Sequence, residues 1–303
     1  MKKIAYILIF SLIMCAFAGC GSETNGPTPQ STEAPTTEAP TTGAANGISG
    51  SGTEEDPWLI GAGSPESVRA TAMDIFLNIE GEGAMIDFAS AEDVPWHDIA
   101  ADVEMASVFD GVTNVGAHAF DSLGKNVEMP SVYLGSTITE IGEGAFEGAK
   151  FADFEIINLS EAVTKIGSRA FADSTLSQIE IFGCPEIAED AFAGITAEIL
   201  YMPDQWDEAK LADYGGTITW RKLVTLAYEE VYEGSDMSGE GTYFIPEGET
   251  YSYNAADYCM SDEFHFDHYE VLGGNLEIAD TTNPELNVTV TENSSLRIVY
   301  VKN

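Results

Sequence analysis

Basic residues are scarce in this chain of 303 residues. It has only 12 lysines and arginines against 51 aspartates and glutamates, which gives a formal net charge of −39. A surface of this sign repels the phosphates of nucleic acids and anionic lipid headgroups. We therefore exclude nucleic acid as a partner and expect high solubility. A more specific hypothesis from the same charge is that the protein prefers cationic partners or binds cations loosely.

Cysteine and histidine are also rare, with four of each. Cys184 and Cys259 lie far apart in the sequence and no close cysteine pair occurs, so we predict neither a disulfide nor a structural zinc site. The motif at residues 265–268 is the one cluster that resembles a metal or catalytic site. On a strand, His265 and Asp267 would share one face while His268 points to the other, and two ligands do not hold a transition metal.

Catalytic motifs are missing as well. The sequence contains no serine nucleophile elbow, no phosphate-cradling glycine loop and no His-Glu-x-x-His. Carboxylate pairs for glycoside cleavage are uninformative, because 51 acidic residues offer very many pairs. We therefore expect no catalytic residue, no metal and no cofactor, and a protein that is not an enzyme.

The N-terminus has the pattern of a targeting segment. Lys2 and Lys3 precede an apolar run, residues 4–17, that is short for a membrane span. The run ends in Phe17-Ala18-Gly19-Cys20, which resembles the lipobox of bacterial lipoproteins. The resemblance implies that residues 1–19 are a signal peptide and that Cys20 carries a lipid on the extracellular face of a bacterial membrane. The alternative is an ordinary secretory signal with an incidental cysteine.

Residues 20–56 have the composition of a tether. They are rich in Thr, Pro, Glu, Gly and Ser, and they include a near-repeat of Thr-Glu-Ala-Pro-Thr at residues 32–42. Such a stretch has almost nothing to bury, so we predict that it is disordered and holds the folded part away from the membrane.

Four segments between residues 115 and 192 repeat one pattern: an apolar residue, Gly or Ala, two spacers, then Ala-Phe. Their phenylalanines, Phe120, Phe146, Phe171 and Phe192, are 26, 25 and 21 residues apart. This period predicts a solenoid in which each unit buries its apolar edge against its neighbours. An apolar-x-apolar step before each segment predicts one short strand per unit in a narrow parallel sheet. We expect the four phenylalanines to stack as an internal ladder, and the glycines to permit close backbone approach.

The repeats resemble the BspA-like (Treponema pallidum type) leucine-rich repeat, whose consensus centres on Val-Thr-x-Ile-Gly-x-x-Ala-Phe. Residues 112–116 and 163–167 match it closely. Residues 77–85 with Pro95-Trp96 resemble the cap that precedes such repeats, and residues 200–206 resemble the closing strand. The resemblance implies a mainly β fold, with an N-terminal β cap over residues 57–100 and a leucine-rich-repeat solenoid over residues 101–221. Studied relatives are surface proteins implicated in adhesion to host matrix proteins or other cells.

Beyond residue 221 the hydrophobic period changes to two. Leu286, Val288 and Val290 alternate with polar residues, as do Leu296 and Ile298, and Gly and Pro punctuate the segments. We predict a small all-β module over residues 222–303. Residues 264–271 and 287–293 resemble the short β repeat modules of bacterial surface proteins (the Listeria–Bacteroides type), which implies a spacer or stalk.

The candidate ligand-binding residues are those that face outward from the predicted sheet. We expect five of them to alternate with the inward apolar residues and two aromatic residues to lie just beyond the strands, namely Ser107, Tyr133, Asn158, Glu180 and Tyr201, with Phe109 and Phe182. Tyrosine and phenylalanine anchor protein or sugar partners with little loss of entropy. The alternative is that these side chains only cover the sheet.

Together these features predict a monomeric, lipid-anchored surface protein whose repeats bind a host protein or a neighbouring cell. Membrane contact would occur only through the lipid on Cys20. Two alternatives remain open: a glycan-capturing lipoprotein, for which the outward aromatic residues argue, and a purely structural spacer.

Overall fold

The computed structural model describes residues 48–128, 130–153 and 155–303. The predicted signal peptide, Cys20 and residues 20–47 of the tether lie outside these ranges. Within them, no helix has the length and apolar character needed to cross a membrane.

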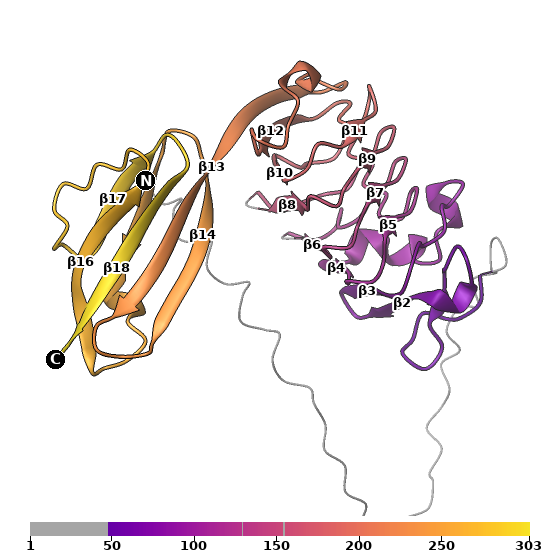
Figure 1. Ribbon diagram of the computed structural model, residues 1–303. Coiled ribbons are helices and arrows are strands. Elements are labelled where there is room, and N and C mark those ends of the chain that lie inside the picture. Colours follow the sequence, from indigo (N-terminus) through magenta and orange to yellow (C-terminus); the bar gives the residue numbers. More distant parts are fainter. Residues whose placement is uncertain (1–47, 129, 154) are drawn as a thin grey trace, which may run out of the picture. The chain divides into compact units, whose positions relative to one another are not determined.

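The described part of the chain is built from strands and short 3-10 helices (Figure 1). The strands are β1 (Trp58–Leu59), β2 (Val68–Met73), β3 (Phe76–Gly81), β4 (Met105–Val108), β5 (Asn114–Val115), β6 (Ser131–Leu134), β7 (Glu140–Ile141), β8 (Ile156–Leu159), β9 (Lys165–Ile166), β10 (Gln178–Ile181), β11 (Glu186–Ile187), β12 (Thr196–Tyr201), β13 (Thr217–Tyr232), β14 (Ser238–Pro246), β15 (Glu249–Asn254), β16 (Phe264–Gly273), β17 (Glu285–Val290) and β18 (Ser294–Lys302). The 3-10 helices are Pro65–Ser67, Ala91–Asp93, His97–Asp102, Glu208–Lys210 and Ala255–Tyr258. The mainly β fold predicted from the sequence is confirmed.

The repeats form a solenoid with strands along two of its sides. On one side β3, β4 and β6 pair in parallel, and further along the chain β8, β10, β12 and β13 do the same. On the other side β5, β7, β9 and β11 form a second parallel sheet, visible as the successive short strands in Figure 1. Each unit therefore has two strands rather than the single one predicted. The second strand is only two residues long and ends at the apolar residue of the Ile-Gly step, so it leaves no alternation in the sequence.

The phenylalanine ladder is confirmed. Phe120, Phe146, Phe171 and Phe192 are fully buried, and successive ring centroids are 5.2, 5.3 and 5.7 Å apart with the rings nearly parallel. Their burial removes large apolar surfaces from water at every step of the solenoid.

The glycines of the Ile-Gly steps lie where backbones approach closely. A Cβ built on Gly142 would lie 2.6 Å from the backbone nitrogen of Ala117, and one on Gly116 would lie 2.1 Å from the carbonyl oxygen of Ile86. Neither glycine has a positive φ. Space, and not a left-handed backbone, is what selects glycine at these positions.

The N-terminal cap is the antiparallel sheet of β1, β2 and β3, and β3 pairs in parallel with the first solenoid strand, β4. Its beginning differs from the prediction that residues 20–56 are a disordered tether. Ile48 is 8% exposed and belongs to the solenoid core, and the carbonyl of Gly52 accepts a hydrogen bond from the amide of Ala72. The folded part therefore begins no later than Ile48. A single apolar side chain and backbone hydrogen bonds hold this segment on the cap, and neither changes the polar composition of the sequence.

One continuous strand joins the solenoid to the C-terminal module. Residues Thr217 to Lys222 of β13 pair with β12, and from Leu223 onward the strand pairs with β14. The module has one sheet in the order β14-β13-β18-β16 and a second, two-stranded sheet of β15 and β17. Leu286, Val288 and Val290 are buried, as are Leu296 and Ile298, so the predicted alternation is confirmed.

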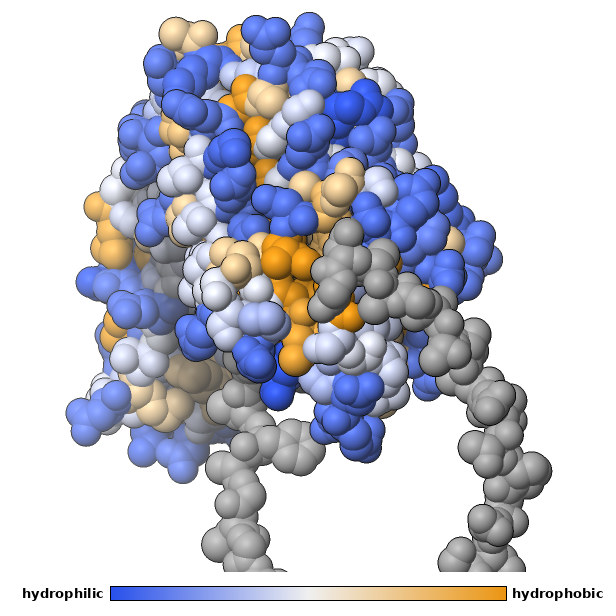
Figure 2. Space-filling view, turned by 90° about the vertical axis from the view of Figure 1, so that its right-hand side faces the viewer, coloured by the Kyte–Doolittle hydropathy of each residue, from blue (hydrophilic) through white to orange (hydrophobic). Residues whose placement is uncertain are grey.

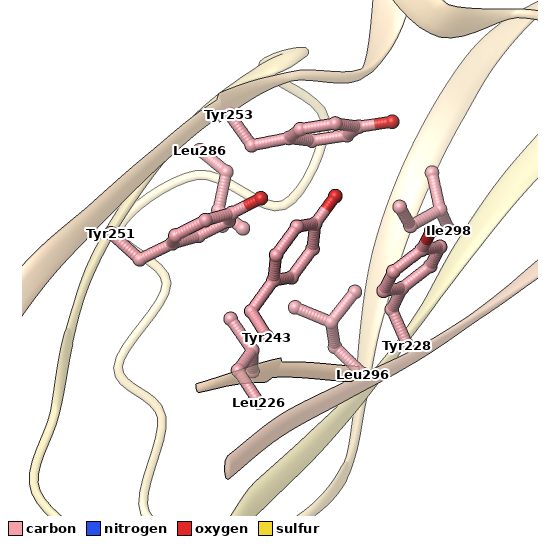
Figure 3. A pocket seen from close by; sticks show the side chains of 8 residues that line it. All are labelled: Leu226, Tyr228, Tyr243, Tyr251, Tyr253, Leu286, Leu296 and Ile298. Carbon is pink, nitrogen blue, oxygen red and sulfur yellow. The ribbon is translucent and has the colours of Figure 1, made fainter. Parts of the chain in front are cut away.

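Tyrosines fill the space between the module's two sheets (Figure 3). The rings of Tyr228 and Tyr243 are stacked at 5.2 Å, and Tyr243 lies 4.7 Å from Tyr251. Tyr228 needs the glycine opposite it, because a Cβ on Gly241 would lie 2.7 Å from the Tyr228 ring. The cavity left between these rings is about 10 Å³, the space of a single water molecule. This cluster is therefore packing and not an open binding pocket.

One face of the protein is mostly hydrophilic. The face turned to the viewer in Figure 2 is covered mainly by hydrophilic residues, and apolar residues gather in a narrow band across it.

Candidate functional site

The outward side of the first solenoid strands forms a regular grid. In register across β2, β3, β4 and β6, one row consists of Met73, Phe76, Met105 and Ser131, and the next consists of Thr71, Asn78, Ser107 and Tyr133. Arg69 and Glu80 begin a third row, and Phe109 follows β4 directly. We call these residues the cap-side face. They point outward because the alternate residues, such as Leu77 and Ala106, are fully buried in the core.

Apolar side chains are exposed on the cap-side face. Phe109 and Tyr133 are 38% and 40% exposed, and their ring centroids lie 6.1 Å apart at an angle of 49°. In the next row Phe76 and Met73 are exposed by 42% and 64%. Two predicted ligand-binding residues are thus brought together as an aromatic pair. The sequence analysis did not predict Met73 and Phe76. The run Met73-Asp74-Ile75-Phe76 could have indicated them, because it places apolar residues at a turn between two strands.

Ser107 differs from the prediction of an exposed residue. It has the expected outward register, between Asn78 and Tyr133, but it is only 6% exposed. A small side chain flanked by larger neighbours lies below the surface that those neighbours make. Ser107 therefore forms the floor of the cap-side face and not part of its contact surface.

Tyr201 also differs from the prediction, because it points into the core. Glu180 of β10 is in register with Leu200 of β12, so Leu200 and not Tyr201 has the outward position. A shift of one residue moves a side chain to the other face of a strand. Tyr201 is 2% exposed and packs against Trp206 and Trp220, with centroids 5.9 and 6.0 Å away. It helps to close the end of the solenoid.

The outward residues of β10 and β12 are covered, in contrast with those of β4 and β6. Phe182 is half-buried, and its ring meets that of Phe244 from β14 edge to face at 4.9 Å. Leu200 is fully buried. A second contact is the ion pair between Arg221 and Glu249 of β15 at 2.7 Å. The C-terminal module thus covers Phe182, and the repeat pattern in the sequence gives no sign of this contact.

Glu180 and Asn158 lie between these two regions. Asn158 of β8 is exposed, and it is paired in register with Glu180. Glu180 is half-buried beside Leu200, and desolvation raises the pKa of its carboxyl to about 7. Near neutral pH this carboxyl group is therefore partly protonated, because its apolar surroundings disfavour the charged form.

The exposed charges at the border of the cap-side face are negative. Asp74, Glu104 and Asp110 are exposed at its border. Its one basic residue, Arg69, is paired with Glu80, with Nε 2.8 Å from Oε1. Within residues 70–164 the only other cations of lysine or arginine type are Lys125 and Lys150, which donate hydrogen bonds to Ser122 and to the carbonyl of Val127. The exposed apolar surface therefore lies in a negative field.

The remaining candidates for chemistry do not assemble into a site. A bulge in β16 between Phe266 and His268 brings the His268 Nδ1 within 2.7 Å of Asp267, while His265 contacts Asn303. The Asp267 carboxylate raises the pKa of His268. Among the described residues no group of three or more metal-ligating side chains comes together. Cys184 and Cys259 are free thiols.

Comparison with known proteins identifies the repeats. Residues 101–210 match the BspA type leucine rich repeat region, in six copies. Among solved structures, a leucine-rich repeat protein from Eubacterium ventriosum is similar, with 20% sequence identity and a TM-score of 0.35. The match covers 52% of this chain and 45% of that one, so this chain spans less than half the length of the relative. No curated protein gives a significant match. The stacked two-strand units and the phenylalanine ladder of residues 101–210 therefore form a BspA-type leucine-rich-repeat region.

Proposed function

We propose that this protein binds a protein partner through the cap-side face while a lipid on Cys20 holds it at a bacterial cell surface. Leucine-rich repeats are a binding scaffold, and extended repeat surfaces suit protein partners. The observation that carries the proposal is the exposed pair of Phe109 and Tyr133 on adjacent strands of a hydrophilic, acidic protein. Exposed aromatic side chains that lie together mark interaction sites in soluble proteins.

The surface location is supported by the sequence of the N-terminus. The segment that ends in Cys20 has the order of a lipoprotein signal, and the Thr/Pro-rich residues that follow suit a tether. The partner is then extracellular, a host protein or a component of a neighbouring cell, and the protein acts as a monomer without enzymatic activity.

Binding by the full chain tests the proposal. The chain in detergent micelles is titrated against immobilised extracellular matrix proteins and against intact cells, with Tyr133→Ala as the variant and Tyr258→Ala as the control. Tyr258 is 45% exposed and belongs to the C-terminal module. We expect saturable binding that Tyr133→Ala weakens about tenfold and Tyr258→Ala leaves unchanged. Binding that both variants retain in full would place the site elsewhere.

The aromatic pair also favours a second candidate, a glycan, since sugar rings stack on exposed aromatic faces. A glycan array separates the two. Glycan signals that disappear in Tyr133→Ala would replace the protein partner by a sugar. No saturable binding to proteins, cells or glycans would leave the spacer as the function.

A further inference from the structure

The cap-side face combines exposed apolar side chains with a negatively charged border. This combination restricts the kinds of partner that can bind there. Met73, Phe76, Phe109 and Tyr133 are each between 38% and 64% exposed. They come from four different strands or strand ends of one sheet, so they are spread over its outward face and do not form a single loop tip. Ser107 lies low between Asn78 and Tyr133, so the larger side chains around it make the contact surface.

The border of the surface carries carboxylates that no basic side chain neutralises within the face. Asp74 lies in the turn between β2 and β3, Glu104 directly precedes β4, and Asp110 follows Phe109. The amide of Glu104 donates to the carbonyl of Ile75, which keeps this glutamate next to the turn. Arg69 is already paired with Glu80. A cation that docks here gains attraction without displacing an existing cation.

Aromatic rings next to carboxylates favour basic side chains for a second reason. A lysine ammonium or arginine guanidinium over the face of a tyrosine or phenylalanine is attracted by the ring quadrupole. The rings of Phe109 and Tyr133 are inclined at 49° to each other, so their faces are not stacked against one another. An acidic segment would meet repulsion from the same border, and a neutral sugar would gain nothing from it.

We infer that the cap-side face binds a basic polypeptide segment, with its apolar side chains on the exposed aromatic and methionine side chains and its lysine or arginine side chains at the carboxylates beside them, Asp74 and Glu104 next to Phe76 and Asp110 next to Phe109. This inference rests on the proposed function, and it adds the charge and the composition of the partner. Such binding is fast and depends on salt, because steering by the negative border is screened at high ionic strength.

Two synthetic peptides of equal length test this inference. One alternates lysine with leucine and phenylalanine, and in the other every lysine is replaced by glutamate. Each is titrated into the full chain and into four variants: Phe109→Ala with Tyr133→Ala, Asp74→Asn with Glu104→Gln, and the controls Leu272→Ala and Glu240→Gln. Leu272 and Glu240 are exposed on β16 and β14, away from the cap-side face.

The lysine peptide should bind saturably and the glutamate peptide should not. The aromatic double variant should weaken binding about tenfold or more, and the carboxylate double variant should reduce both affinity and its salt dependence. Both controls should bind as the parent does. Binding of the lysine peptide that the aromatic variant leaves unchanged would overturn the inference, since it would then reflect only the overall charge of −39.

The result is separable from the test of the proposed function. If matrix proteins or cells bind in a Tyr133-dependent way but neither salt nor the lysine peptide weakens that binding, the function stands and the basic partner is wrong. If the lysine peptide competes with them, both stand. If the aromatic variants change nothing in either experiment, the cap-side face is not the binding surface.

Discussion

The backbone amide of Val132 donates a hydrogen bond to the side-chain oxygen Oε1 of Glu155 over 3.0 Å. The amide of Ser131 in β6 donates to the carbonyl of Glu104, and the amide of Gly135, directly after β6, donates to the carbonyl of Val108 in β4. Because amides alternate in direction along a strand, the amide of Val132 points the other way, toward β8. Glu155 directly precedes β8. Its carboxylate therefore stands where a carbonyl of a paired strand would accept, and the outer sheet ends at β6 and resumes at β8.

Replacing Glu155 by alanine should destabilise the solenoid, because the half-buried amide of Val132 would lose its acceptor. We expect a loss of about 1–3 kcal/mol in the free energy of unfolding, measured by denaturant titration. Glu155→Gln keeps an acceptor oxygen and should be as stable as the parent or more so at neutral pH, because burial raises the pKa of Glu155 and disfavours its charge. Equal stability of the alanine variant and the parent would show that water replaces the carboxylate without loss.

Glu180 should make stability depend on pH. Desolvation raises the pKa of its carboxyl to about 7 from an ordinary value of 4.5. A carboxyl whose pKa is raised on folding binds its proton more tightly in the folded state, so its contribution to stability is complete below pH 4.5 and is lost as the pH rises through 7. The loss is on the order of 3 kcal/mol at most.

The variant Glu180→Gln isolates this effect from the other carboxylates. Denaturation midpoints of parent and variant are compared from pH 4 to 8 (about one point per half unit). The variant should gain stability relative to the parent between pH 4.5 and 7 and keep a constant advantage above that range. Parallel curves over the whole range would mean that Glu180 is hydrated in the folded protein.

The elements that the sequence analysis predicted well are those with a local period. The ladder of Phe120 to Phe192 and the alternation of Leu286 to Val290 follow directly from spacing, because each residue packs against its equivalent in the next unit or strand. The two-residue strands were missed because they are too short to alternate. Tyr201 was assigned to the wrong face because β12 is not followed by an Ile-Gly step that would set its register against β10.

The candidate site was predictable only in part, for a different physical reason. The outward face of a strand is given by parity, which placed Tyr133 correctly, but exposure depends on what else packs there. Phe182 is covered by Phe244 from a strand about 60 residues later in the chain, and Ser107 is sunk between larger neighbours. Neither effect repeats with the solenoid period, so neither leaves a pattern in the sequence.

Phe146 should be the most costly single position of the ladder. It is fully buried, stacked between Phe120 and Phe171, and it also contacts Phe151 at 6.0 Å. Phe146→Ala should lower the free energy of unfolding by about 3–5 kcal/mol, since the cavity cannot collapse between two stacked units. The control Phe109→Ala removes an exposed ring and should cost less than about 1 kcal/mol. Similar losses in the two variants would contradict the internal ladder.

Gly142 tests whether close packing of successive turns selects glycine. A Cβ at this position would lie 2.6 Å from the nitrogen of Ala117 and 2.8 Å from the carbonyl oxygen of Val115, and both are backbone atoms that cannot rotate away. Gly142→Ala should therefore cost about 1–3 kcal/mol by separating adjacent turns. Gly63→Ala is the matched control, because a Cβ there meets nothing within 4 Å. With no clash and a smaller loss of chain entropy on folding, that control should be neutral or stabilise by up to about 1 kcal/mol. If thermal melts show that Gly142→Ala is as well tolerated as Gly63→Ala, the turns of the solenoid are able to move apart. Every unit would then accept alanine at this position, as the fourth unit does with Ala188.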